Sequence, residues 1–405
     1  MGKKCPFVHR LERVASEKYG NVARLVFCIF SRSKGFDFFC NPLSFCFFTR
    51  KKSALLLLVV AATACAKGDK GARGYVIGFY NVENLFDTYH DEGKNDYEYL
   101  PDGANRWTDA RYNRKLRNIA TVIKAMADEN KAFHTVLGLS EVENRHVLED
   151  LVSQKEIADA NYQIVHYDGP DRRGVDVALL YRPEQFKLIE SKSIPFDFNS
   201  KDIKFDMDEE SQGHFRTRDV LMVRGEIKGE MFAFFVAHLP SRIGGKGSDL
   251  RSRGAEIIYE NSAKLMNEYP GIKIVVMGDM NDNPTDESMA VYMHGKENVS
   301  EVGNMDFFSP FTSMLKAGYG SLAYRGEWNI YDIILANEAL VNAPKGTLRI
   351  VPIVKGKYYG RVFNQPFMVQ QTGQYKGTPF RTYSSGSYVG GYSDHYPTYI
   401  VISNK

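Results

Sequence analysis

Carboxylate, amide and histidine side chains gather in five segments of the sequence, of which the first four directly follow an apolar run and the fifth lies near the C-terminus. The segments are residues 81–84 (Asn-Val-Glu-Asn), 140–144 (Ser-Glu-Val-Glu-Asn), 238–242 (His-Leu-Pro-Ser-Arg), 278–284 (Gly-Asp-Met-Asn-Asp-Asn-Pro) and 392–397 (Tyr-Ser-Asp-His-Tyr-Pro). Strand ends at one edge of an α/β sheet are where ligand sites gather. Carboxylate and amide oxygens suit a hard cation such as Mg²⁺ or Mn²⁺, with Ca²⁺ as a further candidate, and such a cation keeps positions free for a phosphate. The pattern therefore predicts metal-assisted phosphate chemistry.

Each segment alone also has a purely structural interpretation. The 278–284 segment is more often a turn held by Asx hydrogen bonds, and a lone histidine after a strand, such as His238, is more often structural. Glu141 could simply favour the start of the following helix through its charge. No single segment decides between the structural and the catalytic interpretation, whereas the ordered set of segments does.

The stretches between these segments predict alternating strands and helices. Helical spacing of apolar residues marks 111–130 and 250–269, and 145–154 also reads as a helix. Strand-like runs lie at 74–81, 135–139, 162–166, 175–181, 186–191, 217–227, 231–238, 272–277, 328–335 and 398–402. Several neighbouring strand-like runs have no helix between them, so mixed sheets with outer helices fit better than a purely parallel, doubly wound sheet. Because no repeat or low-complexity linker follows residue 74, we expect one α/β (α+β) domain over residues 66–405.

As an ordered set, and together with Tyr-Asp-Ile-Ile-Leu at 331–335, the segments resemble the motifs of the endonuclease/exonuclease/phosphatase superfamily. That superfamily includes pancreatic-type deoxyribonucleases, exonuclease-III-like repair nucleases, neutral sphingomyelinases and inositol-polyphosphate 5-phosphatases. The resemblance runs from about Tyr75 to Ile402, and residues 80–87 and 173–181 are further similar to a secreted bacterial branch. It implies a deoxyribonuclease-I-like, four-layered sandwich, in which two mixed β-sheets pack face to face with helices on the outer faces.

The resemblance also implies which residues hold a divalent metal. Glu141 would be the principal ligand, with Glu83 or Asn81 helping directly or through water, and Asp394 would lie beside the metal. Asn81 would also hold Asp279, which would orient and deprotonate the attacking water.

The remaining implied roles concern the phosphate. Asn281 would donate a hydrogen bond to a phosphoryl oxygen as charge builds there. His395, with its tautomer fixed by Asp332, would bind the phosphate or assist proton transfer. His238 would donate to the phosphate or to the leaving oxygen.

Four arginines and one insertion are candidates for substrate binding. Arg216 and Arg218 could fork onto a phosphate or could lie on a solvated strand edge. Arg242 opens a glycine-rich loop. Arg381 lies in the aromatic, glycine-rich insertion 354–392, whose rings could stack on bases, sugars or a lipid face, or could form a small core of their own.

The first 65 residues differ from the rest in charge and cysteine content. They hold all five cysteines and, by count, 11 Lys and Arg against 3 Asp and Glu, which leaves 41 basic and 46 acidic residues, a net charge of −5, for the remainder. The absence of cysteine after Cys65 excludes a disulfide framework, a Cys-ligated zinc and a thiol nucleophile from residues 66–405. A mildly acidic body does not favour a general nucleic-acid binder, although a basic cleft on it would still allow a nuclease.

Residues 50–65 have the pattern of an export signal. Three basic residues precede a short apolar run, and small residues follow before Cys65. The apolar run is too short to span a bilayer stably. A cysteine after small residues resembles a lipoprotein signal, so lipidated Cys65 would attach the protein to a membrane; the alternative is ordinary cleavage near Ala64. Residues 1–49 are either an over-extended start or an unusually long leader.

Three functional hypotheses follow for what we expect to be an exported monomer, either an outer-membrane or periplasmic lipoprotein or a secreted protein. The first is a nuclease that cleaves phosphodiester bonds with a metal and activated water, from family precedent. The second is a phosphodiesterase or phosphatase acting on lipid headgroups, inositol phosphates or other small phosphoesters, which the net charge of the body favours slightly. The third is a catalytically inactive binding module.

Overall fold

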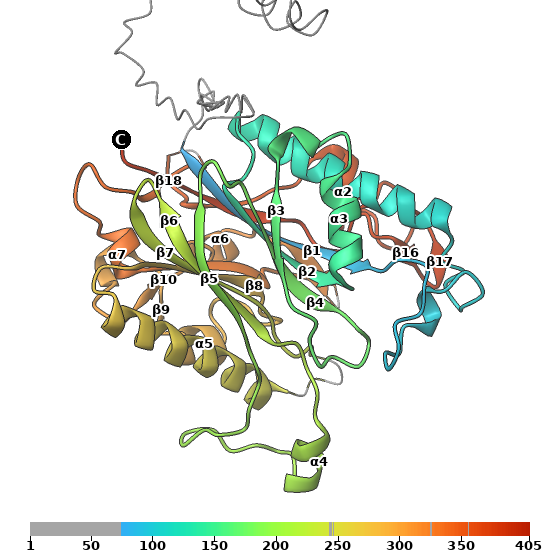
Figure 1. Ribbon diagram of the computed structural model, residues 1–405, viewed down its shortest axis with the longest axis horizontal. Helices are drawn as coiled ribbons and strands as arrows, with labels where there is room; N and C mark the ends of the chain where they lie inside the picture. Colours follow the sequence, from blue (N-terminus) through green and yellow to red (C-terminus); the bar gives the residue numbers. More distant parts are fainter. Residues whose placement is uncertain (1–73, 243–244, 246, 325, 355) are drawn as a thin grey trace, which may run out of the picture. The chain divides into compact units, whose positions relative to one another are not determined.

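The computed structural model describes residues 74–405, apart from 243–244, 246, 325 and 355. The predicted leader, its signal-like segment and Cys65 therefore lie outside the described residues. Two seven-stranded mixed sheets pack face to face, and helices cover their outer faces (Figure 1). The predicted fold class is confirmed. No helix of the described part is long and apolar enough to cross a membrane.

The first sheet has a single parallel pair of strands. Its strands, in order, are β14 (Arg349–Val351), β18 (Thr398–Ser403), β1 (Tyr75–Leu85), β2 (Val136–Val142), β4 (Asp176–Tyr181) and β3 (Gln163–His166), and β15 (Gly360–Val362) also pairs with β18. Helix α2 (Asp109–Asn130) connects β1 to the parallel β2, and α3 (Arg145–Val152) contacts α2. A parallel pair needs such a crossover connection.

The second sheet has two parallel pairs of strands. Its strands, in order, are β5 (Lys187–Ile194), β6 (Val220–Ile227), β7 (Glu230–His238), β8 (Lys273–Asp279), β13 (Asp332–Asn337), β10 (Phe307–Phe308) and β9 (Gly295–Lys296). The parallel pairs are β7–β8 and β9–β10. Helix α5 (Ser248–Glu268) connects the parallel strands β7 and β8, and lies over the outer face of this sheet in Figure 1.

Short elements fill the connections. They are η1 (Tyr97–Tyr99), η2 (Ala158–Ala160), α4 (Glu209–His214), η4 (Ser288–Tyr292), η5 (Val299–Glu301), α6 (Thr312–Lys316), β11 (Leu322–Tyr324), β12 (Glu327–Asn329), α7 (Glu338–Val341), η6 (Pro366–Met368), β16 (Tyr383–Ser384) and β17 (Ser387–Tyr388). The β16–β17 hairpin lies within the predicted aromatic insertion.

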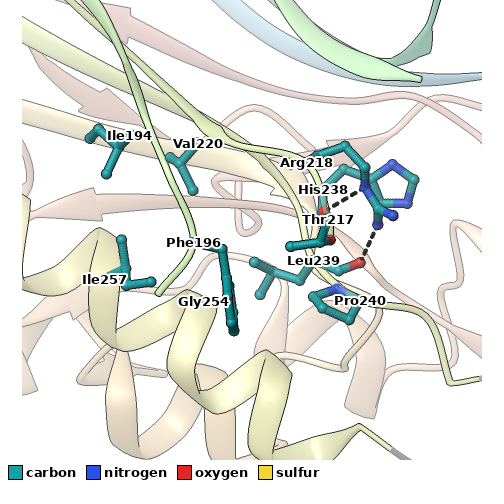
Figure 2. A pocket seen from close by; sticks show the side chains of 10 residues that line it. All are labelled: Ile194, Phe196, Thr217, Arg218, Val220, His238, Leu239, Pro240, Gly254 and Ile257. Carbon is teal, nitrogen blue, oxygen red and sulfur yellow. Dashed lines mark hydrogen bonds between the residues drawn. The ribbon is translucent and has the colours of Figure 1, made fainter. Parts of the chain in front are cut away.

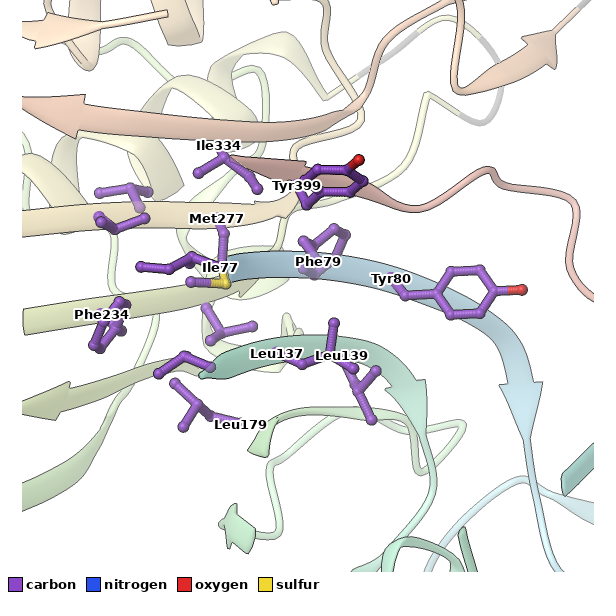
Figure 3. Packing of buried hydrophobic residues seen from close by; sticks show 14 of the residues in the cluster. Ile77, Phe79, Tyr80, Leu137, Leu139, Leu179, Phe234, Met277, Ile334 and Tyr399 are labelled. Carbon is purple, nitrogen blue, oxygen red and sulfur yellow. The ribbon is translucent and has the colours of Figure 1, made fainter. Parts of the chain in front are cut away.

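The facing surfaces of the two sheets form the core (Figure 3). Phe79 of the first sheet and Met277 and Ile334 of the second are fully buried, and each such side chain stabilises the fold by about 1.5–3 kcal/mol. Gly138 in β2 pairs with Phe79 in the first sheet and faces Met277 of the second, and a Cβ there would lie 2.7 Å from the Met277 sulfur. Glycine at this position therefore allows the close approach of the two sheets.

One predicted element is wrong in its extent. Residues 328–335 were expected to form a single strand, but β12 ends at Asn329 and β13 begins at Asp332. The break arises because β12 pairs with β11 in a separate two-stranded sheet, whereas β13 pairs with β8. Between them, the Ile330 amide donates to the side chain of Asn283.

Candidate active site

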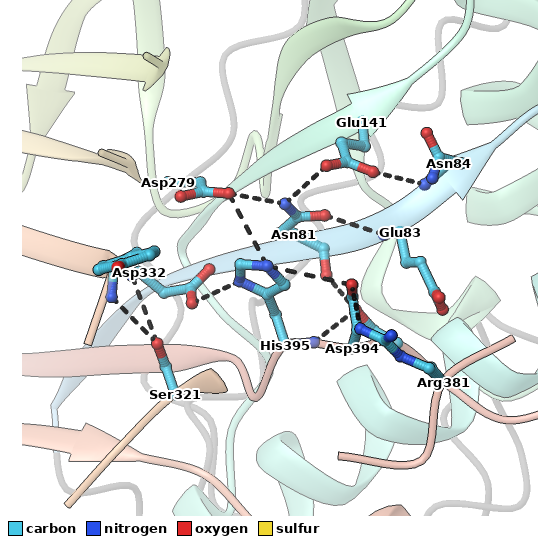
Figure 4. Close-up of polar contacts among 12 residues, drawn as sticks. Asn81, Glu83, Asn84, Glu141, Asp279, Ser321, Asp332, Arg381, Asp394 and His395 are labelled. Atoms are coloured by element: carbon cyan, nitrogen blue, oxygen red, sulfur yellow. Dashed lines mark hydrogen bonds and ion pairs between the residues drawn. The ribbon is translucent and has the colours of Figure 1, made fainter. Parts of the chain in front are cut away.

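Residues from both sheets meet at one edge of the sandwich (Figure 4). In the second sheet, three site residues stand side by side, because Asp332 of β13 pairs with Asp279 of β8, which pairs with His238 of β7. The carboxyl ends of parallel β7 and β8 and the amino end of antiparallel β13 thus coincide. Regular pairing directs in-register side chains to the same face.

The first sheet contributes its residues from an irregular backbone. Glu83, Asn84 and Glu141 have φ of 53°, 51° and 61°, in the left-handed region that non-glycine residues rarely occupy. The β1–β2 register shifts between Asn81 and Leu85, so both strands continue beyond the irregularity. Non-glycine residues in this region cost about 1–3 kcal/mol and cluster at functional sites.

The Asn81 amide joins the two sheets. Its Nδ2 donates to Glu141 Oε1 at 3.1 Å and to Asp279 Oδ2 at 2.9 Å, while its Oδ1 accepts from the Glu83 amide at 2.9 Å. The backbone amide of Asn84 donates to the other Glu141 oxygen, Oε2, at 2.9 Å. Asn81 therefore fixes the separation of two carboxylates that come from positions 138 residues apart in the chain.

A cation fits between Glu141, Asp279 and His238. One potential ligand atom from each lies within 4.8 Å of the other two. Among the described residues, no lysine or arginine forms an ion pair with either carboxylate. Burial, followed by Arg218, Arg173 and His395, holds the pKa of His238 well below its ordinary value. The neutral imidazole is thus suited to ligation or to hydrogen bonding, and its contacts of 3.7 and 3.9 Å to Asp279 and Glu141 are not ion pairs.

His395 and Asp332 form the second feature of the site. His395 Nδ1 lies 2.7 Å from Asp332 Oδ2, and Nε2 lies 3.9 Å from Asp279 Oδ2. Burial opposes protonation of His395, but Asp332 and then Asp279 outweigh it and hold its pKa well above the ordinary value. Burial raises the pKa of Asp279 to about 6, although His395 opposes that rise. A cationic imidazole therefore faces the Asp279 carboxylate.

The other two predicted metal ligands have partners of their own. Glu83 Oε2 accepts from the Thr382 amide at 2.7 Å and lies 3.4 Å from Lys115 Nζ. Burial raises the pKa of Glu83 to about 7, and Lys115 opposes this rise. Asp394 accepts from Arg381 at 2.8 Å. The structure thus brings Glu141 to Asp279 and His238, while Glu83 and Asp394 flank them; metal ligation by any of these residues stays a prediction.

The predicted substrate arginines all have partners within the protein. Arg216 donates to the carbonyls of Gly213 and Phe215 on the β5–β6 connection. Arg218 is largely buried and donates to the His238 and Leu239 carbonyls. Its role here is to hold the backbone at His238.

The two remaining arginines and Asn281 are also bonded within the protein. Arg242 contacts Asp282 at 3.0 Å and Asp286 at 2.9 Å, and Arg381 holds Asp394. Asn281 has φ 50°, and its Nδ2 donates to the Leu239 carbonyl at 3.0 Å. An amide carries two N–H groups, so one remains for a phosphoryl oxygen.

An apolar cavity lies behind His238 (Figure 2). Ile194, Phe196 and Ile257 are among its lining residues, and no carboxylate lines it. Most of its lining is apolar, and the guanidinium of Arg218, which also lines it, donates to the His238 and Leu239 carbonyls. Figure 2 shows that it backs the strand end from which His238 projects.

Sequence reasoning missed Lys115 and Thr382. Lys115 is fully buried on α2 and donates to Thr382 Oγ1 at 2.7 Å and to the Tyr392 carbonyl at 2.9 Å, so it ties α2 to the segment before His395. A signal was available, because Lys115 lies four residues before Ile119, on the apolar face of the predicted helix. No comparable pattern marks Thr382.

Residues 76–404 match the model of the Endonuclease/Exonuclease/phosphatase family. The chain belongs to that family. Its enzymes are hydrolases that use divalent metals, and the carboxylate cluster of this family member is consistent with that use. No curated protein sequence matches the chain significantly.

Solved structures with a similar fold cover most of this family member. The human Nocturnin catalytic domain is 16% identical, with 82% of this chain and 94% of that chain covered and a TM-score of 0.46. A mannosyl-6-phosphatase of Bacteroides thetaiotaomicron is 15% identical (81% and 99% covered, TM-score 0.47). D. rerio TDP2 complexed with a single-strand DNA product is 14% identical (82% and 99% covered, TM-score 0.46). At these identities the likenesses say nothing about substrate.

Proposed function

We propose that this protein is a divalent-cation-dependent phosphoester hydrolase in which Asp279 activates the attacking water. One observation carries the proposal: the Asn81 amide holds Glu141 and Asp279 together, with the His395–Asp332 pair beside them. A bound Mg²⁺ or Mn²⁺, held by Glu141 with Asp279 or His238, would neutralise charge on the phosphoryl group.

The protein's own side chains supply the remaining chemistry. Asp279, oriented by Asn81 and by the Asn281 amide at 3.0 Å, accepts the proton of the water. His395, held protonated by Asp332, stabilises charge on the phosphoryl oxygens or protonates the leaving group. The site therefore offers a base, a proton donor and a place for a cation, which favours an enzyme over an inactive binding module.

Charge around the site favours a small phosphoester over nucleic acid. Three of the four predicted substrate arginines, Arg218, Arg242 and Arg381, each pair with an aspartate within the protein, whereas the described partners of Arg216 are backbone carbonyls. A phosphodiester backbone gains affinity from uncompensated Lys and Arg, whereas a single phosphate needs only the cluster itself. We therefore place hydrolysis of a small phosphoester ahead of nuclease activity.

The test is a substrate panel with purified protein in Mg²⁺ or Mn²⁺. It comprises plasmid DNA, single-stranded DNA, RNA, sphingomyelin, inositol phosphates, sugar monophosphates and p-nitrophenyl phosphate esters. We expect hydrolysis of at least one small phosphoester, its loss in EDTA and its recovery on adding Mg²⁺. Full hydrolysis in excess EDTA after exhaustive dialysis would refute the metal dependence. Efficient cleavage of DNA or RNA with no small phosphoester hydrolysed would restore the nuclease hypothesis.

We also propose export of the protein, on the pattern of residues 50–65. Mass spectrometry of protein from its native cells should find a mature chain that starts at or near Cys65. An intact N-terminus before residue 50 would contradict this proposal.

A further inference from the structure

A cavity of about 210 Å³ opens beside the carboxylate cluster, on the side of Glu83 and Asn84. This volume is below the range of about 300–1,000 Å³ for pockets that hold drug-sized ligands, so the cavity would hold only a small group. The residues around it include Glu83, Asn84, Glu98, Tyr99, Asn105 and Tyr383. They come from the end of β1, from the connection to α2 and from the β16–β17 hairpin. The proposed reaction assigns no role to this cavity.

Asn84 connects the cavity to the proposed phosphate site. Its backbone amide donates to Glu141 Oε2 at 2.9 Å, and the residue also lines the cavity. The neighbouring Glu83 amide donates to Asn81 Oδ1. A phosphate at the cluster would therefore place its alcohol group within reach of the cavity.

The walls of the cavity are held by contacts within the protein. The Tyr99 ring stacks on Phe86 with centroids 4.2 Å apart, and its edge packs against Trp107 at 6.0 Å. The Tyr383 hydroxyl donates to the backbone carbonyl of Asn105 at 2.9 Å, and the backbone amide of Asn105 donates to the backbone carbonyl of Glu98 at 3.0 Å. Prearranged walls reduce the entropy cost of binding a ligand.

Four polar side chains of the cavity are available to a ligand. Within the described part of the chain, no group hydrogen-bonds to the side-chain heads of Asn84, Glu98, Tyr99 or Asn105. Two amides, one phenol and one carboxylate offer both donors and acceptors. A ligand hydroxyl is both a donor and an acceptor, so several hydroxyls on one ring would match this set.

The charge of the cavity restricts the ligand further. Glu83 is compensated by the buried Lys115 at 3.4 Å, so Glu98 carries the one uncompensated charge of the lining, and no described lysine or arginine lines the cavity. A second phosphate would be repelled. A quaternary ammonium group would need open aromatic faces, but one face of Tyr99 is covered by Phe86. A neutral, polyhydroxylated group fits best.

We infer that this cavity binds the sugar ring of a sugar monophosphate whose single phosphate lies at the Glu141–Asp279 cluster. The inference rests on the proposed function, since that function places the phosphate. It predicts that sugar monophosphates are better substrates than aryl phosphates, polyphosphorylated inositols or nucleic acids.

The first experiment compares selectivity in the Mg²⁺-loaded protein. We measure kcat/KM for hexose monophosphates and for p-nitrophenyl phosphate in wild type, Glu98→Gln and Asn105→Ala. Each substitution should lower the kcat/KM for hexose monophosphates relative to that for p-nitrophenyl phosphate by about tenfold. Asn105→Ala removes a hydrogen bond to the ligand, and Glu98→Gln replaces a charged hydrogen bond with a weaker neutral one. Glu92→Gln is the matched control, because Glu92 is exposed in the same connection and does not line the cavity.

The second experiment detects binding without catalysis. Saturation-transfer-difference NMR uses unphosphorylated glucose, mannose and galactose, with choline as a cationic probe. We expect a monosaccharide signal in wild type and Glu92→Gln that weakens in Glu98→Gln and Asn105→Ala.

The outcomes separate this inference from the proposed function. Hydrolysis of p-nitrophenyl phosphate with no preference for hexose phosphates and no monosaccharide signal would overturn the sugar site alone. A choline signal that depends on Glu98, without a monosaccharide signal, would overturn it in favour of a cationic group. A third outcome is that wild type binds a monosaccharide, Glu98→Gln and Asn105→Ala do not, and no phosphoester is hydrolysed. This outcome would overturn the proposed function and leave the sugar site standing.

Discussion

Two βαβ units of the same design build this site by different means. In β1–α2–β2 the strand ends are irregular, with left-handed backbone at Glu83, Asn84 and Glu141 and a shift in register. In β7–α5–β8 the pairing stays regular to its last residues, where His238 faces Asp279. The antiparallel β13 extends this regular row to Asp332.

The difference shows what each kind of strand end can provide. A regular row places imidazole and carboxylate groups side by side, which suits proton transfer between them. A bulged end re-aims side chains and releases backbone amides, and here the Asn84 amide turns to Glu141. We therefore expect Asp279 of the second unit to determine turnover and Glu141 of the first to determine cation affinity. Substitutions at these two residues test this division, and substitutions at Asp332 in β13 and at His395 before β18 test the groups beside them.

The largest effect should follow Asp279→Asn in the regular row. The attacking water would lose its base while the side chain keeps its shape, so kcat should fall by about a thousandfold, within the range for lost acid–base catalysis. Steady-state kinetics at saturating Mg²⁺ measures this, and circular dichroism confirms the fold. Asp159→Asn, exposed and remote in η2, is the matched control. Near-wild-type turnover in Asp279→Asn would refute the mechanism even with the fold intact.

His395→Ala should lower kcat by about a hundredfold, and Asp332→Asn should lower it less. The two groups lie 2.7 Å apart and act as one unit, so the double variant should lose little more than His395→Ala alone. A double-mutant cycle measures this. Losses that multiply would show that the two residues act independently.

Glu141→Gln should affect cation affinity more than turnover. Removing one carboxylate charge should raise the Mg²⁺ concentration for half-maximal activity by about tenfold or more, with a smaller loss in kcat at saturating Mg²⁺ than in Asp279→Asn. A Mg²⁺ titration of activity tests this, with the exposed Glu287→Gln as control. An unchanged Mg²⁺ requirement would contradict the division between the units.

The substitution with the smallest expected effect on activity is His134→Leu, which should instead change stability. It compares the residues that precede β2 with those at the start of β8. β8 begins with Lys273, which pairs with Glu230. Near β2, by contrast, His134 is fully buried with both ring nitrogens unpartnered among the described residues, and burial lowers its pKa to about 3.

The unfolded chain protonates His134 near its ordinary pKa of 6.5, and the folded one does not, so stability should fall as the pH drops from about 6.5 towards 3. The slope is about 1.4 kcal/mol per pH unit. Between pH 7 and pH 5, wild type should lose about 2 kcal/mol more than His134→Leu in urea unfolding. His146→Gln, on the exposed face of α3, should behave as wild type. Equal pH dependence in His134→Leu and wild type would refute this account.

The sequence predicted the fold class and placed the chemistry at strand ends. The spacing of apolar residues and the length of apolar runs predicted most strands and helices. The break at residues 330–331 was not predicted, because it depends on the pairing of β12 with β11 and not on the local sequence. The family resemblance implied the contact between Asn81 and Asp279 and the nearby position of Glu141, and the structure brings the three side chains together from the ends of two different sheets.

The sequence by itself determined which residue types stand at this edge, because the end of an apolar run marks where polar side chains follow a strand. Tertiary structure alone decided their partners. Lys115 meets Glu83 only when α2 packs against β1, and Arg218 is committed to the His238 carbonyl only because β6 and β7 are neighbours. The physical reason is that a carboxylate or guanidinium bonds to whichever charged or polar group is nearest in space. The partners of Glu83 are Lys115 and the backbone amide of Thr382, which are 32 and 299 positions away in the sequence and come close only in the folded sandwich.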